Sequence, residues 1–535
     1  MKQNLLYAFF IGLLFQQSFS QTITLDNTFG TNGKVINASI TNAQAIQLQN
    51  EGKIVSCYLA DFSISGNVRL ARFNSDGSID TTFGTNGFVS TILVTESGKI
   101  NMMKLQPDGK ILVTGAVSSN GANASYFDFC TARFNPDGTI DTSFGTNGYV
   151  ITGFQALSYD QADVIEIQND GKILVGGHSS LYYLSSSNYS ADFAVVRYLP
   201  DGSIDTSFAT NGKFTYNFGT HSVPNSGSFS EDYVVSIRVN SVGKIIVGGD
   251  TTVDETFEDF NKYGFICLNT DGTLDNSFGS NGQKVVDLGQ RGYMMNLKLT
   301  LDDKIIATGQ HDYTVGANDY VNIPLVKLLT NGDYDTSFGN NGIVLTNRDS
   351  SNLSDVSNDL NILPDGKIIC AGATPDTTGS VGNFLLIRFN ANGSIDTTFN
   401  NIGYKTVDFN NSSVSVSSFL IQPDGKFLCA GAIDFSIGCL ARLETDNLSA
   451  NSFVEKSFSV YPNPFSESIT IESKDINLTN TTVRLYDING RNLSKYQLQN
   501  ILSYTIPMNG DLAKGNYVLK ITSEEKTETI KIIKQ

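Results

Sequence analysis

The sequence predicts an all-β protein in which a seven-bladed β-propeller is followed by a small Ig-like β-sandwich. Three observations carry this prediction. A string of the type Asp-x-Ser/Thr-Phe-Gly-x-Asn-Gly recurs about every sixty residues, each repeat has apolar residues spaced for four short strands, and the repeat stops before a strand-rich C-terminal segment. The phenylalanine of the string recurs as Phe29, Phe83, Phe144, Phe208, Phe278, Phe338 and Phe399.

The first twenty residues have the pattern of a cleaved signal peptide. A basic start precedes the apolar run 5–15, and the small residues Ser18 and Ser20 stand just before the expected cleavage point. The apolar run is shorter than the ~20 residues that a membrane-spanning helix needs. We therefore expect residues 1–20 to be removed, leaving a secreted chain that starts at Gln21 and has no membrane span.

Each repeat is interpreted as four antiparallel strands. In one copy, Ile165, Ile167, Ile173 and Val175 alternate with other residues on both sides of an Asp-Gly turn, which is the period of a β-hairpin. A sheet this small cannot cover both of its faces, but sheets packed around an axis bury one another. The recurrent phenylalanine is expected to fill the space between neighbouring sheets.

The seven anchors predict seven blades over residues 21–447. Closure of the ring would pair 22–25 or 34–37 with the last strand, 440–443. An open β-solenoid is the rival, but its repeats are shorter and have fewer strands. The blade count changes by one if a terminal copy is a cap.

Two strings of the repeat also resemble a known family. The phenylalanine string occurs together with Gln-Pro-Asp-Gly-Lys-Ile, here at 106–111, and this combination resembles the bacterial delta-sixty repeat over about 22–447. That family is regarded as a β-propeller of unknown function. The resemblance implies a fold and leaves the activity open.

The repeat ends before a segment of different composition. Residues 448–455 are interpreted as a linker, and 456–535 as a small β-sandwich that is slightly basic, whereas the propeller is strongly acidic. The expected strands are 457–460, 468–472, 482–486, 517–522 and 527–533.

Four blocks of this segment, at 458–465, 483–491, 514–521 and 531–534, resemble the type A C-terminal sorting domain of the type IX secretion system. The resemblance implies a Bacteroidetes source, the type IX secretion machinery as a partner, and attachment to the outer-membrane surface after passage through the periplasm. The alternative is an ordinary Ig-like binding module. The residues implied in sorting are Tyr461, Pro462, Asn463, Pro464, Asp487, Gly490, Arg491, Gly515, Tyr517, Lys531 and Lys534.

Composition argues against several functions. A net charge of −17 and a pI of about 4.6 do not suit a nucleic-acid partner, and we expect no cofactor, because the glycines lie in β-turns. Three histidines leave little for metal or acid–base chemistry, and His178 is interpreted as a surface or capping residue. The six cysteines lack CxxC spacing and are interpreted as buried apolar residues, although a hairpin is able to join Cys429 and Cys439.

The recurrent aspartates are candidates for metal binding or catalysis. Asp76 and Asp80 with a hydroxyl between them superficially resemble a calcium loop, but turn formation explains the same residues. Equivalent carboxylates also lack the asymmetry that a glycosidase needs. We expect no catalytic and no metal site, and a structural ion pair between such aspartates and the recurrent arginines, which Leu268 and Lys327 replace in two copies. These arginines are Arg72, Arg133, Arg197, Arg388 and Arg442.

Irregular insertions, most of them between the third and fourth strands of a repeat, are candidates for ligand binding, because variable loops of a propeller often carry it. The function expected is a non-enzymatic interaction or scaffold protein with an extracellular glycan or protein ligand. The alternative is an extracellular polysaccharide- or protein-degrading enzyme, or a lectin, with its site on the propeller face. The candidate binding residues are Tyr182, Tyr183, Tyr189, Tyr313 and Tyr320.

Overall fold

The computed structural model consists of two compact units, residues 1–446 and 447–535, and each is described by itself. Apart from the short 3-10 turn η1 (Asn50–Gly52), the described elements are strands. The structure describes residues 21–58, 67–93, 98–118, 126–182, 189–219, 221–223, 227–252, 261–315, 318–348, 354–375, 382–410, 412–446, 458–461, 465–473, 481–487, 492–498, 503–508, 512, 515–522 and 527–534.

One repeat shows how the sequence makes a blade. β7 (Gly98–Leu105) and β8 (Ile111–Ser118) form a hairpin whose turn closes with the Gly109 N–H on the Gln106 carbonyl at 2.9 Å. Gly109 has a φ of 85°, where a side chain would be strained. β9 (Phe127–Phe134) and β10 (Tyr149–Thr152) complete the sheet. β8 is buried along its whole length because neighbouring blades cover both faces.

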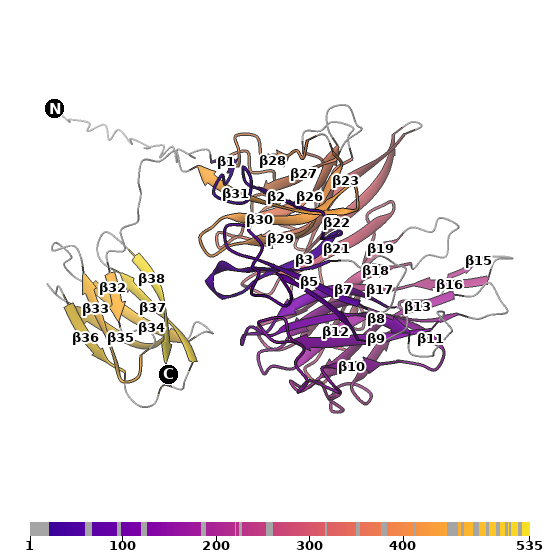
Figure 1. The fold of residues 1–535 in the computed structure, drawn as a ribbon, viewed down its shortest axis with the longest axis horizontal. Helices are drawn as coiled ribbons and strands as arrows, with labels where there is room; N and C mark the ends of the chain where they lie inside the picture. The colour runs from indigo at the N-terminus through magenta and orange to yellow at the C-terminus, as the bar shows by residue number, and fades with distance from the viewer. Residues whose placement is uncertain are drawn as a thin grey trace, which may run out of the picture. The chain divides into compact units, whose positions relative to one another are not determined.

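The same four-stranded unit recurs around an axis (Figure 1). The first strand of each blade contacts the first strand of the next, and β29 contacts β3, so the inner strands form a closed ring. Within the described residues the complete blades besides β7–β10 are β3 (Ala43–Leu48), β4 (Ile54–Tyr58), β5 (Asn67–Phe73) and β6 (Phe88–Ile92); β11 (Ser158–Ile167), β12 (Ile173–Tyr182), β13 (Tyr189–Tyr198) and β14 (Lys213–Tyr216); β17 (Tyr233–Val239), β18 (Ile245–Thr251), β19 (Lys262–Leu268) and β20 (Gln283–Val286); β21 (Gly292–Leu299), β22 (Ile305–Val315), β23 (Asn318–Leu328) and β24 (Ile343–Thr346); and β25 (Val356–Ile362), β26 (Ile368–Pro375), β27 (Gly382–Phe389) and β28 (Tyr404–Val407).

The last blade is built from both ends of the chain. β29 (Val414–Ile421), β30 (Phe427–Ile433) and β31 (Ile437–Asp446) come from the C-terminal side, and both β1 (Thr22–Leu25) and β2 (Lys34–Asn37) pair with β31 (Figure 1). The sequence offered these two segments as alternatives, and the ring uses both. Together with the six complete blades in the described residues, this composite sheet makes seven. β15 (His221–Val223) and β16 (Gly227–Glu231) extend the β11–β14 blade.

Gln21 adds hydrogen bonds to the closure of the ring beyond those of the paired strands. Its N–H donates to the Thr398 carbonyl at 2.8 Å, its carbonyl accepts from the Asn400 N–H at 2.6 Å, and its side-chain oxygen accepts from Arg388 Nη1 at 2.6 Å. The first residue after the expected cleavage point is therefore held by the blade that precedes the composite one.

The C-terminal unit is a sandwich of two sheets. Its sheets have the strand orders β32-β33-β36 and β35-β34-β37-β38, and residues of both share one apolar core that includes Ile469, Leu485, Leu519 and Ile532. β35 and β36 were not predicted from the sequence. The strands are β32 (Phe458–Tyr461), β33 (Ser468–Ser473), β34 (Thr481–Asp487), β35 (Asn492–Leu498), β36 (Ser503–Pro507), β37 (Gly515–Thr522) and β38 (Thr527–Lys534).

The cysteines are free and buried in the described structure. A Cys429–Cys439 disulfide, the one pairing that the sequence left open, is therefore wrong: the facing residue of Cys429 on β31 is Ala441, and Cys439 faces Gly431. Burial raises the pKa of the Cys57, Cys130 and Cys439 thiols to about 12. Such thiols behave as small apolar side chains, as the sequence indicated.

A search of the described residues for a helix of sufficient length and apolarity to cross a bilayer finds none.

Candidate functional site

The recurrent aspartate is the centre of an ion-pair cluster. In the first copy that lies within one blade, Asp80 Oδ2 accepts from Lys53 Nζ at 2.8 Å and from Arg72 Nε at 2.7 Å, while its other oxygen accepts from the Thr82 N–H and hydroxyl. Burial opposes ionisation of Asp80, but the Lys53 ammonium, the Thr82 donors and Arg72 outweigh it and hold the pKa well below its usual range. This carboxylate is fully engaged within the protein.

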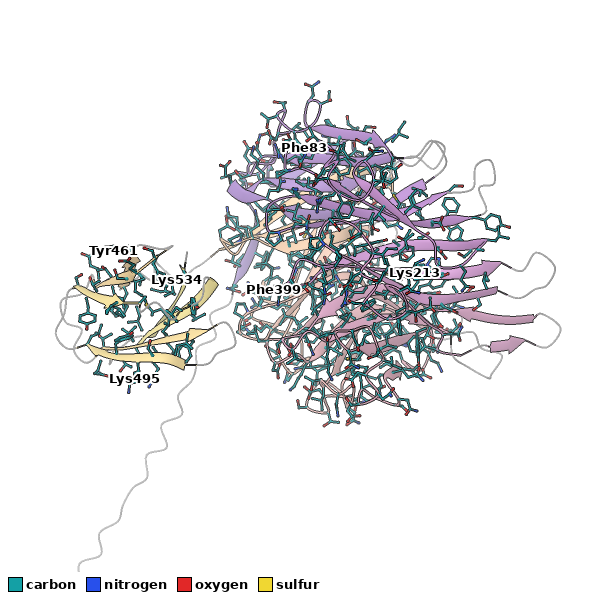
Figure 2. All side chains as sticks on the ribbon, turned by 90° about the horizontal axis from the view of Figure 1, so that it is seen from below. Phe83, Lys213, Phe399, Tyr461, Lys495 and Lys534 are labelled. Carbon is teal, nitrogen blue, oxygen red and sulfur yellow. The ribbon has the colours of Figure 1, made fainter. Side chains whose placement is uncertain are left out.

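The arginine of the cluster also joins one blade to the next. The Arg72 guanidinium lies over the ring of Phe83, with 4.6 Å to the ring centre, and its Nη1 donates to the Pro136 carbonyl of the following blade at 2.6 Å. The Gly84 N–H donates across the same boundary to the Asp137 carbonyl at 2.9 Å. Phe83 is fully buried, as predicted for a residue between blades, and its position is labelled in Figure 2.

Equivalent clusters stand on every recurrent aspartate described, so their pattern explains the repeat motif. Two copies without arginine show which partner of the aspartate is always present. The position equivalent to Arg72 is Cys267 in one blade and Lys327 in another. The sequence had suggested Leu268 in place of Cys267. Both blades keep the lysine that directly precedes the second strand, with Lys244 Nζ 2.5 Å from Asp275 and Lys304 Nζ 3.2 Å from Asp335. The lysine is thus the constant partner.

These contacts show which groups of the protein hold the repeat aspartates. No group of three or more His, Cys, Asp or Glu side chains in the described residues is arranged to hold a metal ion. The carboxylate oxygens are occupied by lysine, arginine and turn donors, so turn and ion-pair chemistry accounts for the motif, in agreement with the structural ion pair predicted from the sequence.

The depressed pKa values predict a loss of stability in acid. A carboxyl whose pKa is lower in the folded than in the unfolded chain (about 3.9) stabilises the fold above that value, and the contribution is lost as the pH falls toward the folded pKa. We expect the urea midpoint of the propeller to drop steeply between about pH 4 and pH 2, because the unfolded pKa is about 3.9 and the folded pKa is about 2. An unchanged midpoint would contradict the ion-pair assignment. The folded pKa is about 2 for Asp205, Asp275, Asp335 and Asp396.

Of the predicted tyrosines, Tyr313 and Tyr320 are brought together. They face each other across β22 and β23, with ring centres 5.6 Å apart, and the Tyr313 hydroxyl accepts from Asn347 Nδ2 at 3.2 Å. Both side chains are partly exposed. Tyr182 and Tyr189 pair at the end of β12 and β13, but their side chains, and all of Tyr183, lie outside the described residues.

The sorting residues that the structure describes have different environments. Tyr461 is 46% exposed at the end of β32, whereas Tyr517 is 7% exposed and belongs to the sandwich core. Gly515 begins β37 with a φ of 152°, and Lys534 Nζ lies 5.5 Å from the centre of the Phe465 ring; Tyr461 and Lys534 are labelled in Figure 2. Outside the described residues lie Pro462, Asn463, Pro464, Gly490, Arg491 and the side chains of Asp487 and Lys531.

The interior of the ring contains a cavity of about 140 Å³. The residues that line it come from all of the described inner strands, and among them are Lys104, Arg238 and Lys298. Each of these cations stands five residues before the turn position of its hairpin, as does Glu166. Sequence reasoning missed this polar cavity. An alignment of the repeats on that turn would have revealed it, because it places the charged residues at one equivalent position.

The environment of His178 on β12 corrects an expectation. His178 was predicted at the surface or as a cap, but it is 6% exposed. Its ring packs edge-on against Tyr233 at 4.7 Å and parallel to Tyr159 at 6.0 Å, and its Nδ1 lies 3.6 Å from Asp163. Aromatic packing from two blades, which a single-repeat pattern cannot reveal, explains the burial.

Comparison with known proteins agrees with this architecture. The model for the secretion system C-terminal sorting domain matches 459–535, and the model for a β-propeller domain of unknown function (DUF5122) matches five segments of the propeller. No curated protein gives a match. The propeller matches are 58–83, 106–144, 168–208, 243–278 and 363–399.

Among solved structures, the chain is similar to PorZ, a surface component of the type IX secretion system of Porphyromonas gingivalis (11% identity, 92% of this chain, TM-score 0.36), and spans 59% of the length of that chain. It is also similar to an endo-arabinase from Bacteroides thetaiotaomicron (10%, 54% of this chain and 95% of that one, TM-score 0.30). A third is a GH43_12 protein from a capybara gut metagenome (10%, 97% and 95%, TM-score 0.27). The chain therefore carries DUF5122 β-propeller repeats followed by a type IX secretion system C-terminal sorting domain.

Proposed function

We propose that this protein is a non-enzymatic interaction protein of the cell surface, exported by the type IX secretion machinery through residues 456–535. The propeller then presents a ligand-binding face to the outside, and the sandwich supplies the export signal. The observation that carries the proposal is the partly exposed aromatic pair on the β22–β23 hairpin, because an aromatic pair at a strand end offers apolar ring surface and hydroxyls to a ligand.

The ion-pair clusters support a binding role over catalysis. A glycosidase of the usual kind needs two carboxylates in different environments on either side of the scissile bond. The recurrent carboxylates instead share one environment, and each is bound to a lysine, as Asp80 is to Lys53 at 2.8 Å and Asp141 to Lys110 at 2.8 Å. They hold the blades together.

The geometry of the pair indicates what it would contact. Tyr313 and Tyr320 are tilted by 33° to each other, so they form a shallow angled platform rather than a flat stack. Asn347 fixes one hydroxyl from the neighbouring loop. A platform of this kind suits a sugar ring or an apolar side chain of a protein partner.

Replacing both tyrosines by serine tests this assignment. The secreted protein is screened against glycan and protein panels, and its hits are titrated with the Tyr313→Ser/Tyr320→Ser variant. We expect at least a tenfold loss of affinity, since aromatic anchors dominate such contacts. Tyr504→Ser is the matched control, because Tyr504 is 39% exposed on the separate C-terminal unit, and it should bind like the parent.

Two results would overturn the proposal. Turnover of any substrate in parallel hydrolase assays favours the enzyme alternative. Binding of the hits that is equally strong in the double serine variant places the ligand on another part of the propeller.

A further inference from the structure

The axis of the propeller concentrates positive charge in an acidic protein. Lys104 on β7, Arg238 on β17 and Lys298 on β21 all line the axial cavity, although the chain as a whole carries a net charge of −17. The carboxylates that face them are Glu166 on β11 and Asp359 on β25. Three cations thus share the interior with two anions.

Both carboxylates are already engaged. Glu166 Oε2 lies 3.1 Å from Lys104 Nζ and 3.5 Å from Arg238 Nη1. Asp359 Oδ1 accepts from Asn296 Nδ2 at 2.7 Å, and its Oδ2 accepts from the Phe419 N–H of the next blade at 2.8 Å. The two anions are therefore held by contacts that do not involve Lys298.

Lys298 is the unpaired member of the group. In the described structure its ammonium has no hydrogen-bond or ion-pair partner, while Arg238 is tied to both Glu166 and Asn296. Burial, together with the nearby Arg238 and Lys104 charges, lowers the pKa of Lys298 to about 8, although Asp359 and Glu166 act in the opposite direction. A charge that is removed from bulk water without a partner is costly, so an anion beside it would stabilise the fold.

We propose that the axial cavity is a binding site for a small oxyanion, either a phosphate or the carboxylate of a sugar acid, with Lys298 as its direct ion-pair partner. Arg238 and Lys104 add long-range attraction, and Gln47 supplies an amide that also lines the cavity. A volume of about 140 Å³ holds several water molecules at ~30 Å³ each, which is enough for one such group. This site is separate from the tyrosine platform.

Calorimetric titration of the full-length protein with inorganic phosphate and with glucuronate tests the proposal and distinguishes the two sources. We expect saturable binding of at least one probe. Lys298→Met should weaken it by about 10- to 100-fold, the value of one charge-assisted hydrogen bond. Lys405→Met is the control, since Lys405 lies on β28, the outermost strand of its blade, and it should bind as the parent does.

Two further readouts separate ligand binding from a structural effect. The Lys298→Met variant should melt at a higher temperature than the parent without ligand, because the unpaired charge is gone, and it should lose the ligand-dependent rise in melting temperature that the parent shows. Glucuronate binding to the parent should weaken as the pH rises from 7 to 9, since Lys298 loses its proton in that range while facing Lys104, Glu166, Arg238 and Asp359.

The proposal is wrong if neither probe binds the parent at millimolar concentration, or if Lys298→Met binds a probe as tightly as the parent. Loss of binding in Lys405→Met to the same extent would also contradict it. None of these results bears on the tyrosine platform, which is tested by its own ligands.

Discussion

Asp26→Ala is expected to lower the free energy of unfolding of the propeller by about 3–5 kcal/mol, the usual effect of removing one partner from a buried ion pair. Asp26 is 1% exposed and accepts from Lys426 Nζ and Arg442 Nε, each at 2.7 Å. Without the carboxylate, the buried Arg442 guanidinium loses its ion-pair partner, while the partly exposed Lys426 keeps Glu444 at 3.2 Å. Because these residues are about four hundred positions apart, the same change also loosens the contact that closes the ring.

Two variants separate the loss of charge pairing from the loss of closure. Asp76 lies in an exposed turn, and its side-chain carboxylate accepts only from Ser78 in the described structure. Asp76→Ala keeps the backbone carbonyl that accepts from the Gly30 N–H, so it should change the unfolding free energy by less than about 1 kcal/mol. Asp141→Ala removes the same cluster from the interior of the chain, where Arg133 and Lys110 are close in sequence.

Urea denaturation gives the unfolding free energies, and hydrogen exchange gives the local effect. We expect Asp26→Ala and Asp141→Ala to be destabilised to a similar degree, with faster amide exchange in β1 and β31 for Asp26→Ala alone. Slow exchange of β1 in the Asp26 variant would show that strand pairing closes the ring without the ion pair.

Removal of residues 456–535 is expected to leave the protein in the periplasm, with at least a tenfold decrease in the amount at the cell surface or in the medium. Residues 459–535 match the sorting domain, and they belong to a compact unit distinct from the propeller. The signal peptide that we expect at 1–20 remains in this variant, so passage across the inner membrane should be unaffected.

Cell fractionation with an antibody against the propeller measures the distribution. Lys495→Gln, on the exposed face of β35 in the same unit, is a control that should be exported normally. Protease resistance of the retained propeller shows that it is folded, which excludes degradation as the cause. Normal amounts of the truncated protein outside the cell would contradict the assignment of the export signal to this segment.

The sequence predicted the parts of the fold that are local and repeated. Hairpin turns such as the one at Gly109 depend on four consecutive residues, and the burial of Phe83 follows from its recurrence in every repeat. The closing strands were also predicted, because a ring of antiparallel blades leaves the final strand without an outer neighbour unless the N-terminal segment supplies one.

The features that were missed depend on residues from different blades. Lys298 and Glu166 are unremarkable in their own strands and form a group only where the inner strands converge. Asp160, Asp232 and Asp355 are buried and accept backbone N–H groups from the segment that arrives from the preceding blade, at 2.7, 2.9 and 2.7 Å respectively. The number of residues between each aspartate and the N–H that it accepts from differs among the three copies. No fixed spacing in the sequence therefore indicates these contacts.

The composite seventh blade also sets an order of events for the molecule. β1 and β2 must wait for β31, since they pair with that strand, and β31 ends at Asp446, directly before the C-terminal unit. During synthesis or passage through a translocon, the leading strands therefore remain without their partner until almost the entire propeller has emerged. Closure of the propeller and emergence of the sorting domain therefore occur close together in time, since both depend on the final quarter of the polypeptide.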